Sequence, residues 1–180
     1  MKRHKYKTSR GAAAKLKGNR AELRWRNELR RIYDDASMRE KIKRVPMSGA
    51  SWMKGDVVDL NDYDTLYEVK NQESLGIPAW WHQTIREAGT SRTAVLVVTQ
   101  SYRPFYVFMQ PDAAEALVRE AGFGDCSNSI NWKKQRGLLD AIDGLDHYGI
   151  VFVDFRDKNG TILAGMKGED YIACKRTLTN

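Results

Sequence analysis

Residues 55–70 read GDVVDLNDYDTLYEVK, and this stretch decides how the chain folds. Two segments rich in β-branched and apolar residues flank the polar sequence NDYD, a pattern typical of a β-hairpin with a turn between its strands. Side chains alternate along a strand, so Glu68 and Lys70 project from the same face. Asp56 opens the other arm of the hairpin. The pattern therefore predicts two carboxylates and one ammonium group in a single cluster.

The segments on both sides of the hairpin predict an α/β fold. A helix is expected from Asn19, because Trp25 and later apolar residues recur at steps of three and four; a second helix is expected between Pro78 and Gly89. The apolar run 94–99 is typical of a strand buried on both faces. The other expected elements are a short strand and loop at 45–51, a strand at 105–109, a helix at 111–121, and a hairpin made by 150–155 and 161–164. This order predicts a central mixed sheet flanked by helices (αβββαβ), with a C-terminal β-hairpin extension and an irregular or weakly helical segment at 123–147.

The 180 residues carry a formal net charge of +7, and this charge is unevenly distributed. Residues 1–44 hold 16 basic and 5 acidic side chains, whereas the rest of the chain holds 14 basic and 18 acidic ones. A basic arm on a mildly acidic body points to a polyanionic partner. We expect three parts: a flexible basic tail at 1–18, an α/β core at 19–122, and an extension at 123–180 whose hairpin packs on the core.

Several classes of protein are excluded by what the sequence lacks. No stretch approaches the ~20 apolar residues that span a bilayer, and the cationic start is not followed by the apolar segment of a signal peptide. Cys126 and Cys174 lack the spacing of a zinc site, so free thiols in a reducing, cytoplasmic setting are expected. No glycine-rich phosphate loop is present, so we expect no nucleotide cofactor. Because no apolar span is present, we also expect no membrane partner.

The predicted cluster is suited to a hard divalent cation. Asp56 and Glu68 would supply oxygen ligands of the kind that Mg²⁺ binds while it keeps several waters. A bound metal lowers the pKa of water and offsets charge in a phosphodiester transition state. Lys70 could position or deprotonate the attacking water or stabilise developing charge, and the sequence leaves these roles open. An E-x-K pair taken alone also occurs as a solvated charged pair on many strands.

Four segments, taken in order, resemble the archaeal-type Holliday junction resolvases and their viral relatives, which belong to the PD-(D/E)xK nuclease superfamily. Their sequences are KGNRAE, RVPMSG, GDVV and LYEVK, beginning at Lys17, Arg44, Gly55 and Leu66. They resemble the family's K-G-x-x-x-E, its R-x-P-x-S-G loop, its P-D-I-V and its E-x-K strand, with glycine in place of the proline. The resemblance covers roughly residues 15–120 and implies a restriction-endonuclease-like nuclease core at 19–122.

The resemblance also implies roles for individual residues. Asp56 and Glu68 would bind Mg²⁺, with the Val69 carbonyl assisting, and Mn²⁺ is expected to substitute for Mg²⁺. Glu22 would be an additional acid near the metal, and Lys70 would be the catalytic lysine. Further site residues that the resemblance implies are Ser48, near the scissile phosphate, Gln83 as an auxiliary polar residue, and the DNA-binding residues Lys17, Arg20, Arg44, Ser48 and Lys54.

Other residues have two open interpretations. Glu28 is an alternative to Glu22, although an exposed helix charge is the simpler reading. Asp59 is expected to be a hairpin residue that could touch the metal through water. Trp80 and Trp81 could stack on an unpaired base, but core packing or a dimer contact is favoured. His82 is expected to be a surface or supporting histidine.

The leading hypothesis is a Mg²⁺-dependent endodeoxyribonuclease that cuts branched DNA, a Holliday junction resolvase acting in recombination and repair. A homodimer is expected, because a four-way junction offers two symmetric scissile positions. A restriction-like, nicking or repair nuclease of the same superfamily is the first alternative. A basic DNA-binding protein with an inert E-x-K cluster is the alternative of another class.

Overall fold

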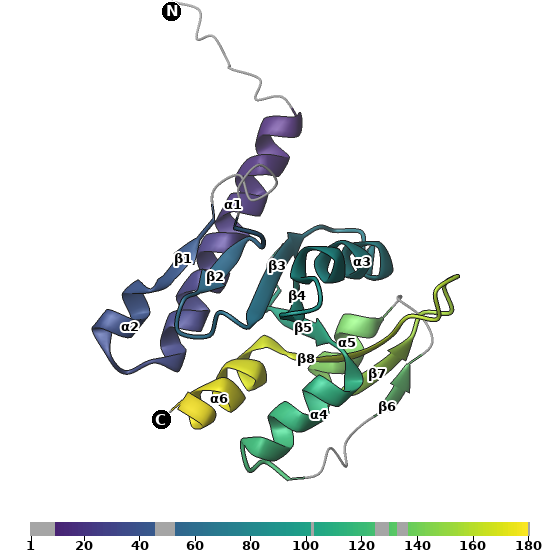
Figure 1. Ribbon diagram of the computed structural model, residues 1–180. Coiled ribbons are helices and arrows are strands. Elements are labelled where there is room, and N and C mark those ends of the chain that lie inside the picture. The colour runs from purple at the N-terminus through teal and green to yellow at the C-terminus, as the bar shows by residue number, and fades with distance from the viewer. Residues whose placement is uncertain (1–9, 46–52, 102, 125–129, 133–136, 180) are drawn as a thin grey trace, which may run out of the picture.

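The computed structural model describes residues 10–45, 53–101, 103–124, 130–132 and 137–179. Within these residues, eight strands form one mixed sheet in the order β1-β2-β3-β4-β5-β8-β7-β6 (Figure 1). The strands are β1 (Ile42–Arg44), β2 (Val57–Asp59), β3 (Thr65–Asn71), β4 (Thr93–Thr99), β5 (Tyr106–Met109), β6 (Ile130–Trp132), β7 (Val151–Asp154) and β8 (Ile162–Lys167).

The predicted hairpin is confirmed near one edge of this sheet. Strands β2 and β3 run antiparallel, with Val57 opposite Tyr67. Strand β3 then pairs in parallel with β4, and α3 (Ile77–Ala88) makes the crossover between them. A parallel pair requires such a crossover, because two parallel strands cannot be joined by a tight turn. The β3–α3–β4 unit therefore fixes the strand that carries Glu68 and Lys70.

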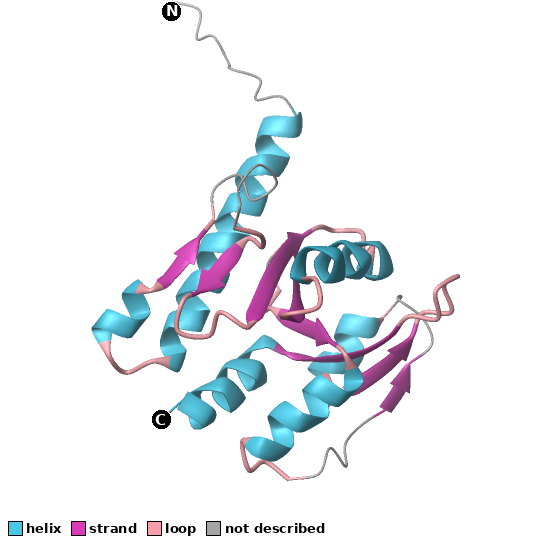
Figure 2. Ribbon diagram, in the orientation of Figure 1, coloured by secondary structure: helices cyan, strands magenta, loops and turns pink. Residues whose placement is uncertain are grey.

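Helices cover both faces of the sheet, as Figure 2 shows. The face that carries Tyr67 packs against α1 (Arg10–Leu29), α4 (Pro111–Glu120) and α6 (Gly168–Thr179). The face that carries Leu96 packs against α3 and α5 (Leu138–Asp143). Two short elements, η1 (Arg30–Ile32) and α2 (Ala36–Glu40), link α1 to β1. The predicted α/β class, a mixed sheet flanked by helices, is confirmed.

No helix in the described ranges combines the length and the apolar character that a membrane span requires.

An aromatic core ties the two ends of the chain to the hairpin. Trp25 of α1 is fully buried, and its ring meets that of Phe105 edge-on at 5.3 Å between centroids. Tyr67 of β3 and Tyr171 of α6 also pack edge to face, and their hydroxyl oxygens lie 3.0 Å apart in a buried hydrogen bond. Edge-to-face pairs of this kind contribute about 0.5–1.5 kcal/mol beyond the area that they bury.

The start of the first helix differs from the prediction. Helix α1 begins at Arg10 rather than at Asn19, so the described part of the predicted flexible tail is helical. The cause is local, because the segment from Ala12 onward is rich in alanine, lysine and leucine, which all favour helix. Strand β1 was not predicted, and the short strand and loop expected at 45–51 lie, apart from Val45, outside the described residues.

The C-terminal region is more ordered than predicted. The hairpin of β7 and β8 is confirmed, and β8 also pairs with β5, so the hairpin continues the central sheet. Strand β5 is buried along its whole length and needs a hydrogen-bonding partner on each side. Elements β6 and α5 lie in the segment expected to be irregular or weakly helical, and the final helix α6 was not predicted.

The junction between β8 and α6 yields a prediction about stability. A Cβ atom at Gly168 would lie 2.8 Å from the backbone oxygen of Phe105, which cannot move without disturbing β5. Gly168→Ala should therefore lower the free energy of unfolding by about 1–3 kcal/mol, measured by urea denaturation. Gly11→Ala is the matched control, because a Cβ there meets nothing within 4 Å and the site is helical. An equal loss in both variants would contradict this packing account.

Candidate active site

Asp56 is positioned by the turn that leads into β2. Its backbone N–H donates to the carbonyl of Tyr67 at 2.8 Å, and its Oδ2 accepts from the backbone N–H of Val69 at 2.8 Å. Gly55 adopts φ +91°, and a Cβ there would lie 3.1 Å from the same Tyr67 oxygen, so glycine suits this close approach. The Asp56 carboxylate is thereby fixed beside the strand that carries Glu68.

Glu68, Lys70 and Gln83 form a closed hydrogen-bonded triangle. The Nζ atom of Lys70 donates to Glu68 Oε1 at 2.5 Å and to Gln83 Oε1 at 3.1 Å. Gln83 Nε2 donates to Glu68 Oε1 at 3.0 Å. The first two residues share a face of β3, and Gln83 comes from α3, which covers that face. The structure thus joins Glu68, Lys70 and Gln83 by hydrogen bonds and places Asp56 close enough for its charge to act on Glu68.

Glu87 is a third carboxylate at this site, beside Asp56 and Glu68, and the sequence analysis did not single it out. It lies one helical turn after Gln83, and its Oε1 accepts from Gln83 Nε2 at 3.0 Å. The two acceptors, Glu68 and Glu87, determine the orientation of the amide, since the opposite orientation would place an oxygen against both carboxylates. The i,i+4 spacing on one helix face is the signal that could have identified Glu87.

The environment of Glu68 disfavours its ionised form. Burial raises the pKa of this carboxyl group to about 7, and the neighbouring charges of Asp56 and Glu87 act in the same direction. Lys70 opposes these effects through its charge and its hydrogen bond. The side chain is only 3% exposed, so water offers it little solvation. The cluster therefore has an excess of negative charge that a cation would relieve.

The donor set fits a divalent metal ion. Asp56 and Glu68 offer carboxylate oxygens, the ligand type that Mg²⁺ and Mn²⁺ prefer, and each feels the charge of the other. A cation bound between them would stabilise the ionised form of Glu68. In the described part of the chain, no group of three or more His, Cys, Asp or Glu residues is placed to hold a metal. Any ion here would therefore depend on two carboxylates, with water or substrate completing its coordination.

Glu22, the predicted additional acid, forms an ion pair with Arg44. It accepts a hydrogen bond from Arg44 Nε, and Arg44 Nη2 donates to Asn19 Oδ1 at 2.7 Å. Helix α1 and the end of β1 are thus joined by a partly buried ion pair. The predicted third acid is therefore paired with a guanidinium group, and it does not form a three-carboxylate group with Asp56 and Glu68.

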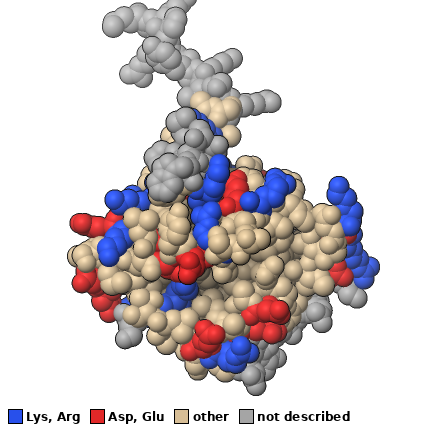
Figure 3. Space-filling view, in the orientation of Figure 1, with Lys and Arg blue, Asp and Glu red and all other residues tan. Residues whose placement is uncertain are grey.

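Three of the predicted DNA-binding residues, Lys17, Arg20 and Arg44, lie on α1 or contact it. Lys17 donates to Glu73 at 2.5 Å, Arg20 is exposed, and Lys54 is half-buried just before Gly55. Figure 3 shows Lys and Arg side chains gathered on the surface where α1 leaves the body of the protein. The predicted residue Ser48 lies outside the described residues.

Asp59, Trp81, His82 and Glu28, for which the sequence left two interpretations open, all make packing or polar contacts within the protein. Asp59 is buried and accepts from the hydroxyl of Tyr33 at 2.7 Å, which accounts for its carboxylate without a metal. Trp81 packs in the core beneath α3, as favoured. His82 Nε2 lies 3.0 Å from Asp157 Oδ2 in the β7–β8 turn, a supporting contact. Glu28 of α1 forms an ion pair with Arg31 of η1, consistent with a surface charge.

The raised pKa of Glu68 gives a pH-dependent prediction. In the folded state this carboxyl group binds its proton more tightly than in the unfolded chain. Its contribution to the free energy of unfolding is therefore fully present below about pH 4.5 and is lost as the pH rises through about 7. Glu68→Gln keeps the size and the hydrogen bonds but cannot ionise. We expect its free energy of unfolding to fall less between pH 5 and pH 8 than that of the wild type, by about 3 kcal/mol at most.

Urea denaturation at several pH values measures this difference. Parallel pH profiles for the wild type and the variant would contradict the assignment of a raised pKa to Glu68.

Comparisons with known proteins agree with this geometry. Residues 13–137 match the model of the family described as "Phage putative PDDEXK endonuclease". This range contains Asp56, Glu68, Lys70 and Gln83, together with most of the sheet. No curated protein and no solved structure matches the chain. Because the family model spans more than half of the sequence, the chain belongs to this phage endonuclease family and is a nuclease of the PD-(D/E)xK superfamily.

Proposed function

We propose that this protein is a metal-dependent endodeoxyribonuclease in which Asp56 and Glu68 hold Mg²⁺ and Lys70 acts on the scissile phosphate. The observation that carries the proposal is the buried, electrostatically strained Glu68 carboxylate, held by Lys70 and close to Asp56. When bound, the metal would supply Lewis-acid stabilisation and an activated water. The match to a nuclease family supports the same chemistry.

The residues of the chain have separable tasks in this proposal. The side chain of Lys70 is 20% exposed, so its ammonium group can reach a phosphate that approaches the end of β3. There it would donate hydrogen bonds to the phosphate oxygens as negative charge develops during hydrolysis. Gln83 keeps this ammonium group in place through its Oε1 atom, and Glu87 keeps Gln83 in the required orientation. Asp56 is fixed by the backbone, which limits the motion of one metal ligand.

We propose that the substrate is branched DNA, and that among branched DNAs it is the four-way junction. The basic surface around α1 suits recognition of phosphate positions rather than base edges. A four-way junction has two-fold symmetry, so a homodimer would present one active site to each scissile position. The resemblance of the four sequence segments to the resolvases favours this substrate over linear DNA. Glu22, close to Arg44, remains a proposed auxiliary acid that substrate binding could release from its ion pair.

Replacement of the lysine tests the catalytic proposal. Lys70→Ala should reduce the rate of DNA cleavage by about 10²–10³-fold, because it removes a donor that stabilises transition-state charge. DNA binding measured in the presence of a chelator should be retained. The matched control is Lys158→Ala, which removes an exposed lysine from the β7–β8 turn and should cleave like the wild type. Equal activity of the two variants would argue against a catalytic Lys70.

A comparison of substrates and metals tests the specificity. We expect Mg²⁺ or Mn²⁺ to support cleavage of a four-way junction, a chelator to abolish it, and linear duplex of the same sequence to be cut more slowly. Light scattering should give the mass of a dimer. Equal cutting of linear duplex would favour the restriction-like, nicking or repair alternative. Metal-independent binding without hydrolysis under any condition would favour the non-catalytic DNA-binding alternative.

A further inference from the structure

A groove with basic walls lies beside α1, on the opposite side of β3 from the catalytic triangle. It has a volume of about 710 Å³ and is lined by α1, the end of β3 and the segment that precedes β5. Four of its lining residues are cations: Lys17, Arg20, Arg24 and Arg103. Among the described residues, no acidic side chain lines it. We call this the α1 groove; a volume of this size is typical of pockets that take small ligands rather than a rigid duplex.

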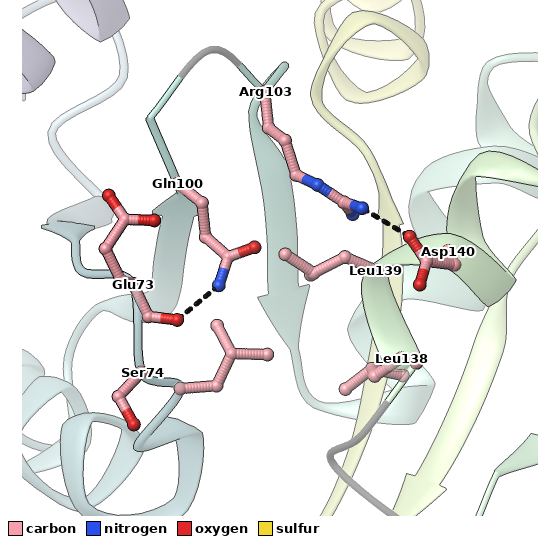
Figure 4. A pocket seen from close by; sticks show the side chains of 9 residues that line it. Glu73, Ser74, Gln100, Arg103, Leu138, Leu139 and Asp140 are labelled. Atoms are coloured by element: carbon pink, nitrogen blue, oxygen red, sulfur yellow. Dashed lines mark hydrogen bonds and ion pairs between the residues drawn. The ribbon is translucent and has the colours of Figure 1, made fainter.

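The four cations are not equally available to a ligand. Lys17 is held by Glu73, and Arg103 is held by Asp140 of α5, as Figure 4 shows for the second pair. In the described part of the chain, neither Arg20 nor Arg24 makes an ion pair with an acidic side chain. Arg24 lies over the ring of Phe105, 4.8 Å from its centroid, which orients the guanidinium group without neutralising it. The groove therefore keeps two positive charges that an anion can neutralise.

The remaining lining of the groove is suited to a nucleobase. Apolar side chains, among them Leu16, line it between the cations, and Leu16 is 53% exposed. Asn71 adds a polar group, and its Oδ1 is buried without a hydrogen-bond partner in the structure. An unpartnered acceptor is costly until a donor reaches it. A turn of the Asn71 amide toward the groove would expose this oxygen to the exocyclic amine of a base. A ligand made only of phosphates would contact neither the apolar lining nor the Asn71 amide.

The neighbouring pocket does not have this character. It has a volume of about 290 Å³ and shares Arg103 with the α1 groove, but Glu73 and Asp140 also line it (Figure 4). These carboxylates would repel a phosphate. The groove beside α1 is therefore the better candidate for an anionic ligand.

We propose that the α1 groove binds an unpaired segment of DNA, with phosphates on Arg20 and Arg24 and a base against Leu16 and Asn71. This inference rests on the proposed function, since it places a single-stranded arm beside the catalytic cluster. Positively charged grooves that also offer contact surface for base faces are typical of single-strand binding sites. A paired duplex buries its base faces in its own stack and could offer the groove only its backbone.

The test uses two leucines on the same helix. Leu16 lines the groove, whereas Leu23 is 39% exposed and does not. Fluorescence anisotropy with EDTA present would compare binding of a blunt duplex with that of the same duplex carrying an overhang of about eight nucleotides. The wild-type protein and Leu23→Asp should bind the overhang substrate about tenfold more tightly, and Leu16→Asp should lose this preference. Both variants should keep the wild-type thermal unfolding midpoint.

A second pair of variants separates phosphate contact from base contact. Arg20→Ala should weaken binding of the overhang substrate and should lower the slope of log Kd against log salt concentration by about one. Arg26→Ala changes the same helix outside the groove and should leave both quantities unchanged. Equal wild-type affinity for the two substrates, or an equal loss on both substrates in Leu16→Asp, would overturn the proposal. Because no hydrolysis occurs with EDTA, failure of the nuclease proposal would appear separately, as absence of cleavage when Mg²⁺ is added.

Discussion

The structure depends on one constraint, the burial of the Glu68 carboxylate in the middle of a sheet. A buried carboxylate is unfavourable unless it accepts hydrogen bonds or faces a positive charge. Lys70 and Gln83 satisfy one of its oxygens, while Asp56 and Glu87 make its ionised form harder to keep. The fold tolerates this arrangement because the rest of β3 is packed on both faces. The same arrangement creates the electrostatic demand for a cation on which the proposed activity rests.

The alternation of side chains along β3 separates chemistry from packing. Glu68 and Lys70 face α3, whereas Tyr67 and Val69 join the core beneath α1 and α6. A slip of one residue in the pairing would send the apolar pair toward α3 and the charged pair into the aromatic core. The contacts of Tyr67 with Trp25 and Tyr171 therefore fix the register as well as the stability. Residues far from the chemistry thus hold the reactive groups in place.

Elements determined by local sequence signals were predicted correctly, whereas contacts between distant segments were not. The hairpin, α3 and β4 were predicted because their signals are local: alternation, a turn sequence, and proline and glycine at the helix ends. The ion pair between Glu22 and Arg44 could not be predicted, since it joins segments that only the folded sheet brings together. The start of α1 was predicted too late because the apolar stripe was given more weight than alanine-rich helix propensity. Helix α6 was missed because its polar, weakly periodic sequence becomes a helix by docking Tyr171 into the aromatic core.

The position of the α1 groove relative to the catalytic triangle restricts which form of DNA can contact both sites at once. Lys70 and Asn71 are consecutive on β3, so their side chains leave opposite faces of the strand. A polymer that contacts Asn71 in the groove must cross the end of β3 before one of its phosphates reaches Lys70. A stiff duplex with a persistence length of about 150 base pairs does not make so sharp a turn without a large deformation energy. An unpaired strand makes this turn at little cost, and branched DNA contains unpaired or easily unpaired nucleotides at its branch point. The geometry of a single strand of the sheet therefore connects the groove to the proposed preference for branched substrates.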